Sequence, residues 1–159
     1  MLGKSAMPPV DTKYFGAMDY RDESVFEFPF GLPAFESEKR FVLIDVPESL
    51  PLVFLQSLAQ RDLCFLAFPV LVVEPDYQLG ISEEDLAALE LDTDRQPELG
   101  TEALVLALLS LHDGHVPTAN LMAPVVVNLK SRRALQAVRA DRRYSHEHPI
   151  GTPEEEGVC

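Results

Sequence analysis

The stretch FEFPFGLPAFES, residues 26–37, combines four phenylalanines, two prolines and one glycine, and it has no obvious catalytic side chain. Its first three phenylalanines, Phe26, Phe28 and Phe30, occupy alternate positions, which places them on one face of a strand. Pro29 cannot donate to a sheet ladder, and the sequence GLP at 31–33 is turn chemistry. The stretch therefore predicts a strand, a turn and apolar side chains that fill the core of a β protein.

Short apolar or aromatic runs recur along the rest of the chain. They are separated by Pro, Asp, Ser or charged residues, and their spacing of about ten residues is typical of β-sandwiches and β-barrels. Thirteen prolines among 159 residues also favour turns over long helices. We predict a mainly all-β fold, a compact antiparallel β-barrel-like single domain. The predicted strands are residues 10–16, 24–28, 41–46, 52–55, 63–68, 70–73 and 124–129.

One segment, SEEDLAALEL at 82–91, departs from this pattern and predicts a short α-helix. Ser82 suits the N-cap, Asp85 occupies the capping-box position, and acidic residues fill the first turn, where the helix dipole favours them. Leu86 and Leu89 would share one buried face. The apolar run 103–111 is ambiguous by itself. Its alanines and leucines favour a helix, whereas its length and apolar character also fit a strand buried on both faces.

The two ends of the chain differ from its middle in composition. Residues 1–9 are expected to form a flexible N-terminus, residues 10–145 the domain, and residues 146–159 an acidic, disordered tail with too little apolar content to pack. The first ten residues lack the apolar stretch and cleavage site of a secretory signal. The apolar run 63–73 contains a proline and is shorter than the ~20 residues that cross a bilayer. These features predict a cytoplasmic protein with no membrane partner.

The net charge of −13 opposes binding to nucleic acid, because such binding is built largely from Lys and Arg that neutralise phosphates. Residues 130–143 form a basic strip with six basic residues and one acid, so this window carries +5 and the remainder carries −18. The strip leaves a nucleic-acid role open, but a solvated basic face that offsets the acidic remainder is the favoured interpretation. An acidic excess instead suggests a basic protein partner, and we predict no direct nucleic-acid partner.

Reactive constellations are scarce. The histidine pairs His112/His115 and His146/His148 lack the helical spacing and the third ligand of a zinc enzyme. The chain has no glycine-rich phosphate loop, and Cys64 lies in an apolar run, where burial raises a thiol pKa. Carboxylates are numerous, but sequence separation cannot show whether two of them meet in a cleft. We predict that the protein is not an enzyme and uses no cofactor and no metal.

Several short patterns occur in a fixed order between Asp11 and Tyr144. They are DTKYFG at 11–16, FPFGLPAFE at 28–36, LQS at 55–57, PDY at 75–77 and TANLMAPVVVN at 118–128, followed by Gln136 and Tyr144. In this order the patterns resemble the bacterial flagellar assembly factor FliW family. Ala34 departs from the family, which commonly has glycine there. This departure predicts that the backbone at residue 34 does not need a positive φ.

The resemblance implies a non-enzymatic, β-barrel-like domain with one short helix, and it implies a strand for residues 103–111. It also implies two protein partners that bind in turn. The first is flagellin, bound at its C-terminal helical region, and the second is CsrA, a small RNA-binding protein that represses flagellin translation. Export of flagellin would free this factor to bind and antagonise CsrA, which relieves the repression. The sequence leaves both competitive and allosteric antagonism open.

Polar motif residues and surface acids are the candidates for contact with these partners. Gln56, Asn120 and Asn128 interrupt apolar stretches, and each either finds its hydrogen-bond partners in its own turn or strand edge or serves the backbone of a partner. As candidates for contact they are expected to be exposed, and the acids at 83–85 could meet a basic regulator. The full set of candidates is Gln56, Ser57, Tyr77, Glu83, Glu84, Asp85, Asn120 and Asn128. The motif residues expected to be structural are Phe28, Gly31, Leu32, Pro33, Phe35 and Pro124.

A small-ligand-binding β-barrel is the alternative function. The aromatic content and the barrel-like architecture would suit an apolar cavity closed by strands.

Overall fold

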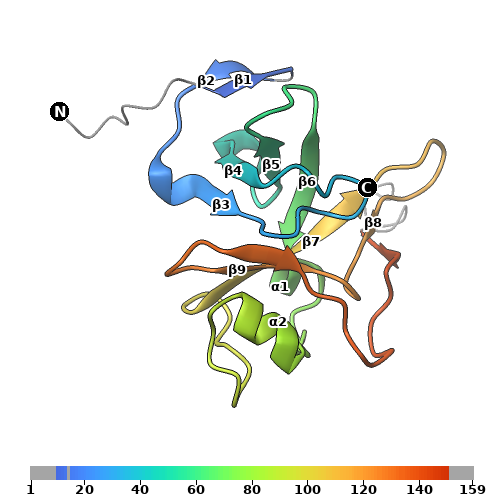
Figure 1. Cartoon of the computed structure of the whole chain (residues 1–159). Helices are drawn as coiled ribbons and strands as arrows, with labels where there is room; N and C mark the ends of the chain where they lie inside the picture. Colours follow the sequence, from blue (N-terminus) through green and yellow to red (C-terminus); the bar gives the residue numbers. More distant parts are fainter. Residues whose placement is uncertain (1–9, 14, 151–159) are drawn as a thin grey trace.

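Antiparallel strands dominate the structure, a computed structural model that describes residues 10–13 and 15–150 (Figure 1). The strands are β1 (Val10–Thr12), β2 (Gly16–Met18), β3 (Val25–Glu27), β4 (Arg40–Asp45), β5 (Val53–Ser57), β6 (Cys64–Pro69), β7 (Ala103–Ser110), β8 (Thr118–Ala119), β9 (Val125–Asn128), β10 (Ala134–Gln136) and β11 (His148–Pro149). The α-helices are α1 (Val70–Val73) and α2 (Glu83–Ala88), and the 3₁₀ turns are η1 (Asp22–Ser24) and η2 (Pro47–Ser49). The predicted mainly all-β fold is confirmed.

Seven strands pair in the order β10-β9-β7-β6-β5-β4-β3, and the short strands β8 and β11 extend one end of β7. The path curls until its two end strands meet. There, Glu27 of β3 forms an isolated bridge to Arg133, and its backbone N–H donates to the carbonyl of Arg132 at 2.9 Å. No full ladder joins β3 to β10, so the sheet is barrel-like without being a closed barrel. The β1–β2 hairpin forms a separate two-stranded sheet at the top of Figure 1.

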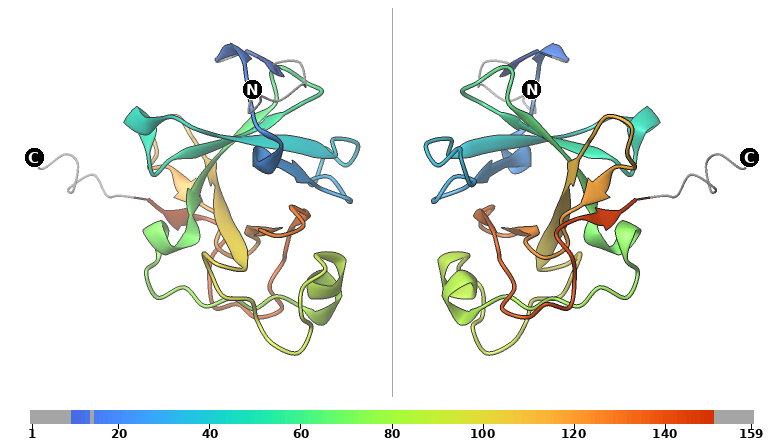
Figure 2. Two further views of the ribbon diagram at one scale, coloured as in Figure 1. Left: turned by 90° about the vertical axis from the view of Figure 1, so that its left-hand side faces the viewer. Right: turned by 90° about the vertical axis from the view of Figure 1, so that its right-hand side faces the viewer.

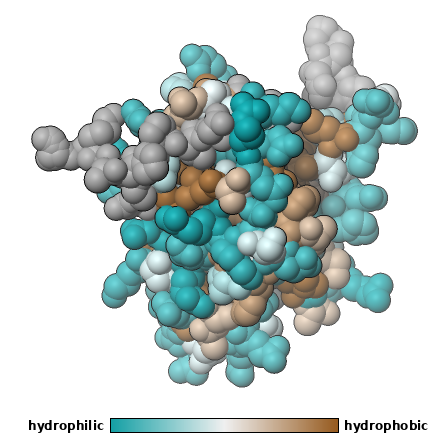
Figure 3. Space-filling model, turned by 45° about the horizontal axis from the view of Figure 1, so that its top comes forward, coloured by the Kyte–Doolittle hydropathy of each residue, from teal (hydrophilic) through white to brown (hydrophobic). Residues whose placement is uncertain are grey.

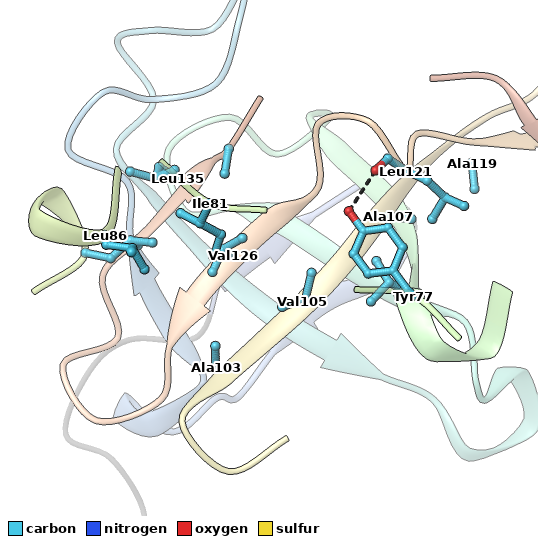
Figure 4. Close-up of a cluster of buried hydrophobic side chains, with 13 residues drawn as sticks. Tyr77, Ile81, Leu86, Ala103, Val105, Ala107, Ala119, Leu121, Val126 and Leu135 are labelled. Atoms are coloured by element: carbon cyan, nitrogen blue, oxygen red, sulfur yellow. Dashed lines mark hydrogen bonds between the residues drawn. The ribbon is translucent and has the colours of Figure 1, made fainter. Parts of the chain in front are cut away.

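Two main apolar clusters fill the molecule. The first lies on the inner side of the curved seven-strand sheet, and all seven strands contribute to it. Within this cluster, Phe28 packs against Phe41 with ring centroids 5.2 Å apart. The second lies over the other face of β7, β9 and β10, where α1, α2 and their connections cover it (Figures 2 and 4). A smaller cluster lies under the β1–β2 hairpin, where the Phe15 ring meets the Phe54 ring edge-on.

The predicted helix and the ambiguous apolar run both have clear outcomes. α2 begins after Ser82, whose hydroxyl accepts a hydrogen bond from the backbone N–H of Asp85 at 3.1 Å. Leu86 and Leu89 are buried together in the second cluster. The run 103–111 is strand β7, as the family resemblance implied. Its alternate residues enter the two main clusters, which explains why it is apolar on both faces.

One predicted strand is wrong and another is too long. Residues 70–73 form the single helical turn α1, closed by the N–H of Glu74 donating to the carbonyl of Val70 at 2.8 Å. Burial of Val70 against the second cluster outweighs the β preference of the valines here. The predicted strand 10–16 is right for Val10–Thr12, which is β1, but the chain reverses before β2 begins at Gly16. The Thr12 hydroxyl accepts from the N–H of Phe15 and donates to the carbonyl of Gly16, both at 2.8 Å, which reverses the chain.

The opening stretch also differs from its prediction. Phe26 and Phe28 enter the first cluster, but β3 ends at Glu27 and Phe30 is 58% exposed. Pro33 and Ala34 lie at the centre of a tight turn in which the N–H of Phe35 donates to the carbonyl of Leu32 at 2.7 Å. Ala34 has a φ of 72°, so the prediction that residue 34 avoids positive φ is wrong. The turn geometry demands it, since a proline-led turn of this kind has positive φ at its next residue.

The boundaries of the domain differ from the predicted ones at the C-terminal side. β11 lies within residues 146–159, which the sequence predicts as a tail, and it pairs with β8 through His148↔Ala119 and Pro149↔Thr118. The N–H of Ile150 donates to the carbonyl of Pro117 at 2.9 Å. The ordered domain therefore continues to Ile150. Residues 151–159 and the N-terminal residues 1–9, predicted as flexible, lie outside the described residues.

Candidate partner-binding surface

The LQS motif supports a turn from within the protein. Gln56 and Ser57 are both 0% exposed, so the prediction that Gln56 is exposed is wrong. The Gln56 amide Nε2 donates to the carbonyls of Ser57, Gln60 and Arg61 at 3.1–3.3 Å. The Ser57 hydroxyl accepts from the backbone N–H groups of Ala59 and Gln60 and donates to the Glu38 carboxylate at 3.1 Å. Together these side chains satisfy the backbone of the β5–β6 turn.

The two asparagines of the last long motif also bond to the backbone. Asn128 is 5% exposed, and its Nδ2 donates to the carbonyl of Leu89 at 2.8 Å. Its Oδ1 accepts from the N–H of Lys130 at 2.8 Å, so Asn128 joins the end of α2 to the β9–β10 turn. Asn120 is half-buried, and its Oδ1 accepts from the N–H groups of Met122 and Ala123. The burial of Asn128 contradicts the prediction that it is exposed.

Tyr77 belongs to a buried polar cluster that the sequence did not indicate. Its hydroxyl donates to the carbonyl of Leu121 at 2.8 Å (Figure 4). The Arg139 guanidinium lies beside the Tyr77 and Tyr144 rings, donates to the carbonyl of Gln78 at 2.6 Å, and forms a two-pronged pair with the Asp141 carboxylate at 2.8 and 3.0 Å. Burial raises the pKa of Tyr77, and the hydrogen bond from Arg139 lowers the pKa of Asp141 to about 2.

This cluster fixes the C-terminal segment to the second core. Tyr144 stacks on Tyr77 with ring centroids 4.4 Å apart, and its hydroxyl accepts from the N–H of Gln78 at 3.0 Å. Gly80 completes the packing, because an added Cβ there would lie 2.8 Å from Nη2 of Arg139. Arg139 is 5% exposed although it belongs to the predicted solvated basic strip. Its alternation with Ala137 along the chain is the only signal that could have indicated burial.

The motif residues predicted to be structural have structural positions. Phe28, Leu32 and Pro124 are buried, and the Phe35 ring packs edge-on against Phe65 with centroids 5.7 Å apart. Gly31 has a φ of 64°, and an added Cβ would lie 2.5 Å from the backbone of Glu36. Only glycine fits this close approach. Pro33 is exposed and leads the turn at Ala34.

The acids of α2 are the predicted partner-binding residues that the structure places on the surface. Glu83 and Glu84 are exposed, and Asp85 is half-buried at the first turn. The helix beneath them is held by buried Leu86 and Leu89 and by Arg133, whose Nε donates to the carbonyl of Ala88 at 3.0 Å. We call Glu83, Glu84 and Asp85 the α2 acidic surface. It consists of three adjacent acidic residues on a helix that is anchored to the second apolar cluster.

The segment after α2 adds acids that the sequence interpretation did not single out. Glu90, Asp92, Asp94 and Glu98 are exposed. Arg95 lies among them, with its Nε 3.6 Å from Oδ2 of Asp92. Arg95 also forms a two-pronged pair with Glu102, with Nη1 2.8 Å from Oε1, and its hydrogen bonds lower the pKa of Glu102 to about 2. The α2 acidic surface itself contains no basic residue, so its charge remains uncompensated within the helix.

The sequence predicts no catalytic or metal site, and the structure describes the positions of the histidines and the cysteine that this prediction concerns. His112 and His115 are exposed in the connection between β7 and β8, and burial raises the pKa of the half-buried Cys64 thiol to about 11. Within residues 10–13 and 15–150, no group of three or more His, Cys, Asp or Glu side chains could hold a metal ion. Nor does this part of the chain contain a helix long and apolar enough to span a membrane.

The interior offers the alternative ligand-binding function no support. The curl is filled by apolar side chains from all seven strands, including Phe28, Phe41 and Leu55, each 0% exposed. On the face shown in Figure 3, apolar residues appear in several separate areas between hydrophilic ones instead of in one continuous band. Dispersed areas of this kind are ordinary protein surface.

Comparison with known proteins gives consistent matches. A family model described as FliW protein matches residues 9–150. The flagellar assembly factor FliW of Syntrophomonas wolfei is 35% identical over 138 residues, which cover 87% of this chain and 85% of that relative. The protein of the same name from Bacillus subtilis is 33% identical over 143 residues, which cover 89% and 96%. A crystal structure of the flagellar assembly factor FliW superimposes with a TM-score of 0.78 at 25% identity, covering 92% of this chain and 99% of that one.

Proposed function

Because this chain belongs to the FliW family of flagellar assembly factors, we propose that it binds flagellin at the C-terminal region of flagellin and, when free of flagellin, binds and antagonises the translational regulator CsrA. The antagonism relieves repression of flagellin translation. This is a non-enzymatic role in the cytoplasm that requires two protein partners and no cofactor. The names of the relatives, all assembly factors, support a regulatory role over catalysis.

The α2 acidic surface is the observation that supports CsrA as a partner. An RNA-binding protein carries a basic face, and an acidic surface speeds its encounter and disfavours competing acidic proteins. Glu83 and Glu84 extend from a helix whose inner face, Leu86 and Leu89, is at most 1% exposed. The helix therefore holds the backbone of these acidic residues in place, which limits the conformational entropy lost on binding.

The buried motif residues take a different part in this proposal. Gln56, Ser57, Tyr77 and Asn128 bond to the backbone of their own chain, so we assign them to the fold that carries the interface. Direct contact with either partner is proposed for Glu83, Glu84 and Asp85. Asn120 is half-buried and belongs with the first group, because its side-chain oxygen is occupied by two backbone N–H groups.

A competition pull-down tests the proposal. The purified chain should retain flagellin and CsrA separately at micromolar concentrations, and added flagellin should displace CsrA. The variant Glu83→Lys/Glu84→Lys should weaken CsrA capture by about tenfold or more, with an effect that shrinks as salt rises. Glu48→Lys/Asp62→Lys, which reverses two exposed acids outside α2, is the matched charge control. Failure to retain either partner would overturn the proposal.

The helix variant needs a folding control, because acids in the first turn stabilise α2 by about 0.3–1 kcal/mol each. Thermal melting of Glu83→Gln/Glu84→Gln separates this loss from charge reversal. If the double Lys variant melts like the double Gln variant and still captures CsrA like the unaltered chain, α2 does not belong to the interface. Measuring CsrA affinity with saturating RNA present distinguishes the two modes of antagonism, since competitive binding weakens as RNA is added and allosteric binding retains a ternary complex.

A further inference from the structure

Strand β4 extends past the strand that covers its outer edge. Its pairing with β3 ends at Val25↔Val42, whereas its pairing with β5 continues to Asp45↔Val53. The last three residues of β4, 43–45, therefore have a strand partner on one side and none on the other among the described residues. An uncovered edge of this kind presents main-chain hydrogen-bonding groups that another strand can use.

The hydrogen-bond pattern shows which groups these are. The carbonyl of Lys39 accepts from the N–H of Phe28, which lies toward β3, and the carbonyl of Arg40 accepts from the N–H of Leu58, which lies toward β5. Backbone groups of successive strand residues point to opposite sides. Leu43 and Asp45 therefore direct their main-chain groups away from β5, past the end of β3.

A groove opens beside this edge. It has a volume of about 250 Å³ and is formed by the connection from β2 through η1 on one side and by β4 on the other. Val42 and Ile44 lie beneath it and are 0% and 7% exposed, so they leave an occupant little apolar surface. The full lining is Met18, Asp19, Tyr20, Arg21, Ser24, Val42, Leu43, Ile44 and Asp45.

The charge of the groove favours a basic occupant. Asp19 and Asp45 contribute two carboxylates and Arg21 one guanidinium, so the lining is net negative. The whole chain carries −13, and this field attracts a positively charged segment over a longer range. The basic side chains of a bound strand would remain in solvent near the exposed carboxylate of Asp45.

We propose that this groove binds an extended, basic segment of a partner protein, which adds as a short strand along Leu43 and Asp45. Main-chain hydrogen bonds to β4 supply the affinity, as in other cases of strand addition, and basic side chains supply the preference. The site is separate from the α2 acidic surface and does not depend on the proposed function. With three residues of edge, the expected affinity is in the micromolar to millimolar range.

The test uses the full chain and a short, capped peptide of alternating lysine and valine. We expect it to shift the amide NMR signals of Leu43 and Asp45, with an affinity that falls as salt rises. A capped peptide of alternating glutamate and valine should bind about tenfold more weakly or worse. Absence of shifts at these amides up to about 1 mM lysine peptide overturns the proposal, as does equal binding of the two peptides.

Two variants separate strand addition from simple charge attraction. Asp45→Pro removes the outward N–H while leaving the β5 side of β4 untouched, and we expect it to abolish binding. Asp45→Asn keeps the N–H and should bind with a moderate, salt-sensitive loss. Glu48→Asn, outside the groove, should bind like the unaltered chain.

A second measurement avoids any folding defect in Asp45→Pro. A lysine/valine peptide N-methylated at every residue has no N–H left to donate to β4 from either edge, so the unaltered protein should bind it about tenfold more weakly. Equal binding of the methylated and unmethylated peptides overturns strand addition.

Discussion

Arg139 lies beside the paired rings of Tyr77 and Tyr144, with its guanidinium carbon 5.4 Å from the centroid of the first ring and 4.8 Å from that of the second. The two tyrosines are 67 positions apart by numbering, and the arginine joins the segment after β6 to the segment after β10. Stacking on aromatic rings and two-pronged pairing with Asp141 both require the planar guanidinium. This relationship therefore makes the C-terminal segment part of the core.

Loss of the Arg139 guanidinium should destabilise the protein. We expect Arg139→Ala to lower the free energy of unfolding by about 2–4 kcal/mol, because the carbonyl of Gln78 and the hydroxyl of Tyr77 lose a buried donor. Arg139→Lys should retain only part of the lost free energy of unfolding, since an ammonium cannot form the two-pronged pair with a carboxylate. Urea denaturation measures both. An Arg139→Ala variant within about 0.5 kcal/mol of the unaltered chain would contradict this prediction.

Stability should fall in acid partly through Asp141. Its hydrogen bonds with Arg139 lower the folded-state pKa from 3.8 to about 2. A lowered folded pKa contributes stability that is present above the unfolded pKa and is lost as pH falls through the folded value. The expected window is therefore from about pH 5 down to about pH 2. Unfolding measured across it should be less pH-dependent in Asp141→Asn, and an unchanged slope would refute the assignment.

Ala34→Gly should stabilise the protein. Ala34 is exposed with a φ of 72°, a conformation that costs an L-residue about 1–2 kcal/mol and costs glycine little. After the larger unfolded-state entropy of glycine is subtracted, a gain of about 0.5–1 kcal/mol remains. Ala17→Gly, in the exposed strand β2, is the matched control and should destabilise by about 0.5–1 kcal/mol. Thermal melting of both variants should therefore give shifts of opposite sign.

Asn128 should contribute to the stability of the fold and not to contact with a partner. Asn128→Ala removes the bonds to the carbonyl of Leu89 and to the N–H of Lys130, and we expect a loss of about 2 kcal/mol. Gln136→Ala, which removes one bond to the carbonyl of Ala123, should cost about 1 kcal/mol or less. Well below the melting temperature, Asn128→Ala should retain partner affinity. A stable variant with lost affinity would instead place Asn128 in the interface.

The hydrogen-bond partners of the polar motif residues could not be predicted from the sequence. Gln56 and Asn128 were recognisable as polar side chains inside apolar runs, which need partners if buried. Their partners are carbonyls at Gln60 and Leu89, and the second of these lies 39 residues away. Local pattern cannot show whether such a partner belongs to the same chain or to another protein, which is why the predicted exposure of both residues is wrong.

The sequence by itself determined the elements whose signals are local. Alternating apolar residues specified most strands, the Ser82 cap and the Leu86/Leu89 pair specified α2, and the ordered motifs indicated the family, because each of these signals lies within a few residues. The tertiary structure alone decided the helical turn at 70–73 and the burial of Arg139. Both depend on distant contacts, since burial of Val70 and the tyrosine pair beside Arg139 outweigh local preference.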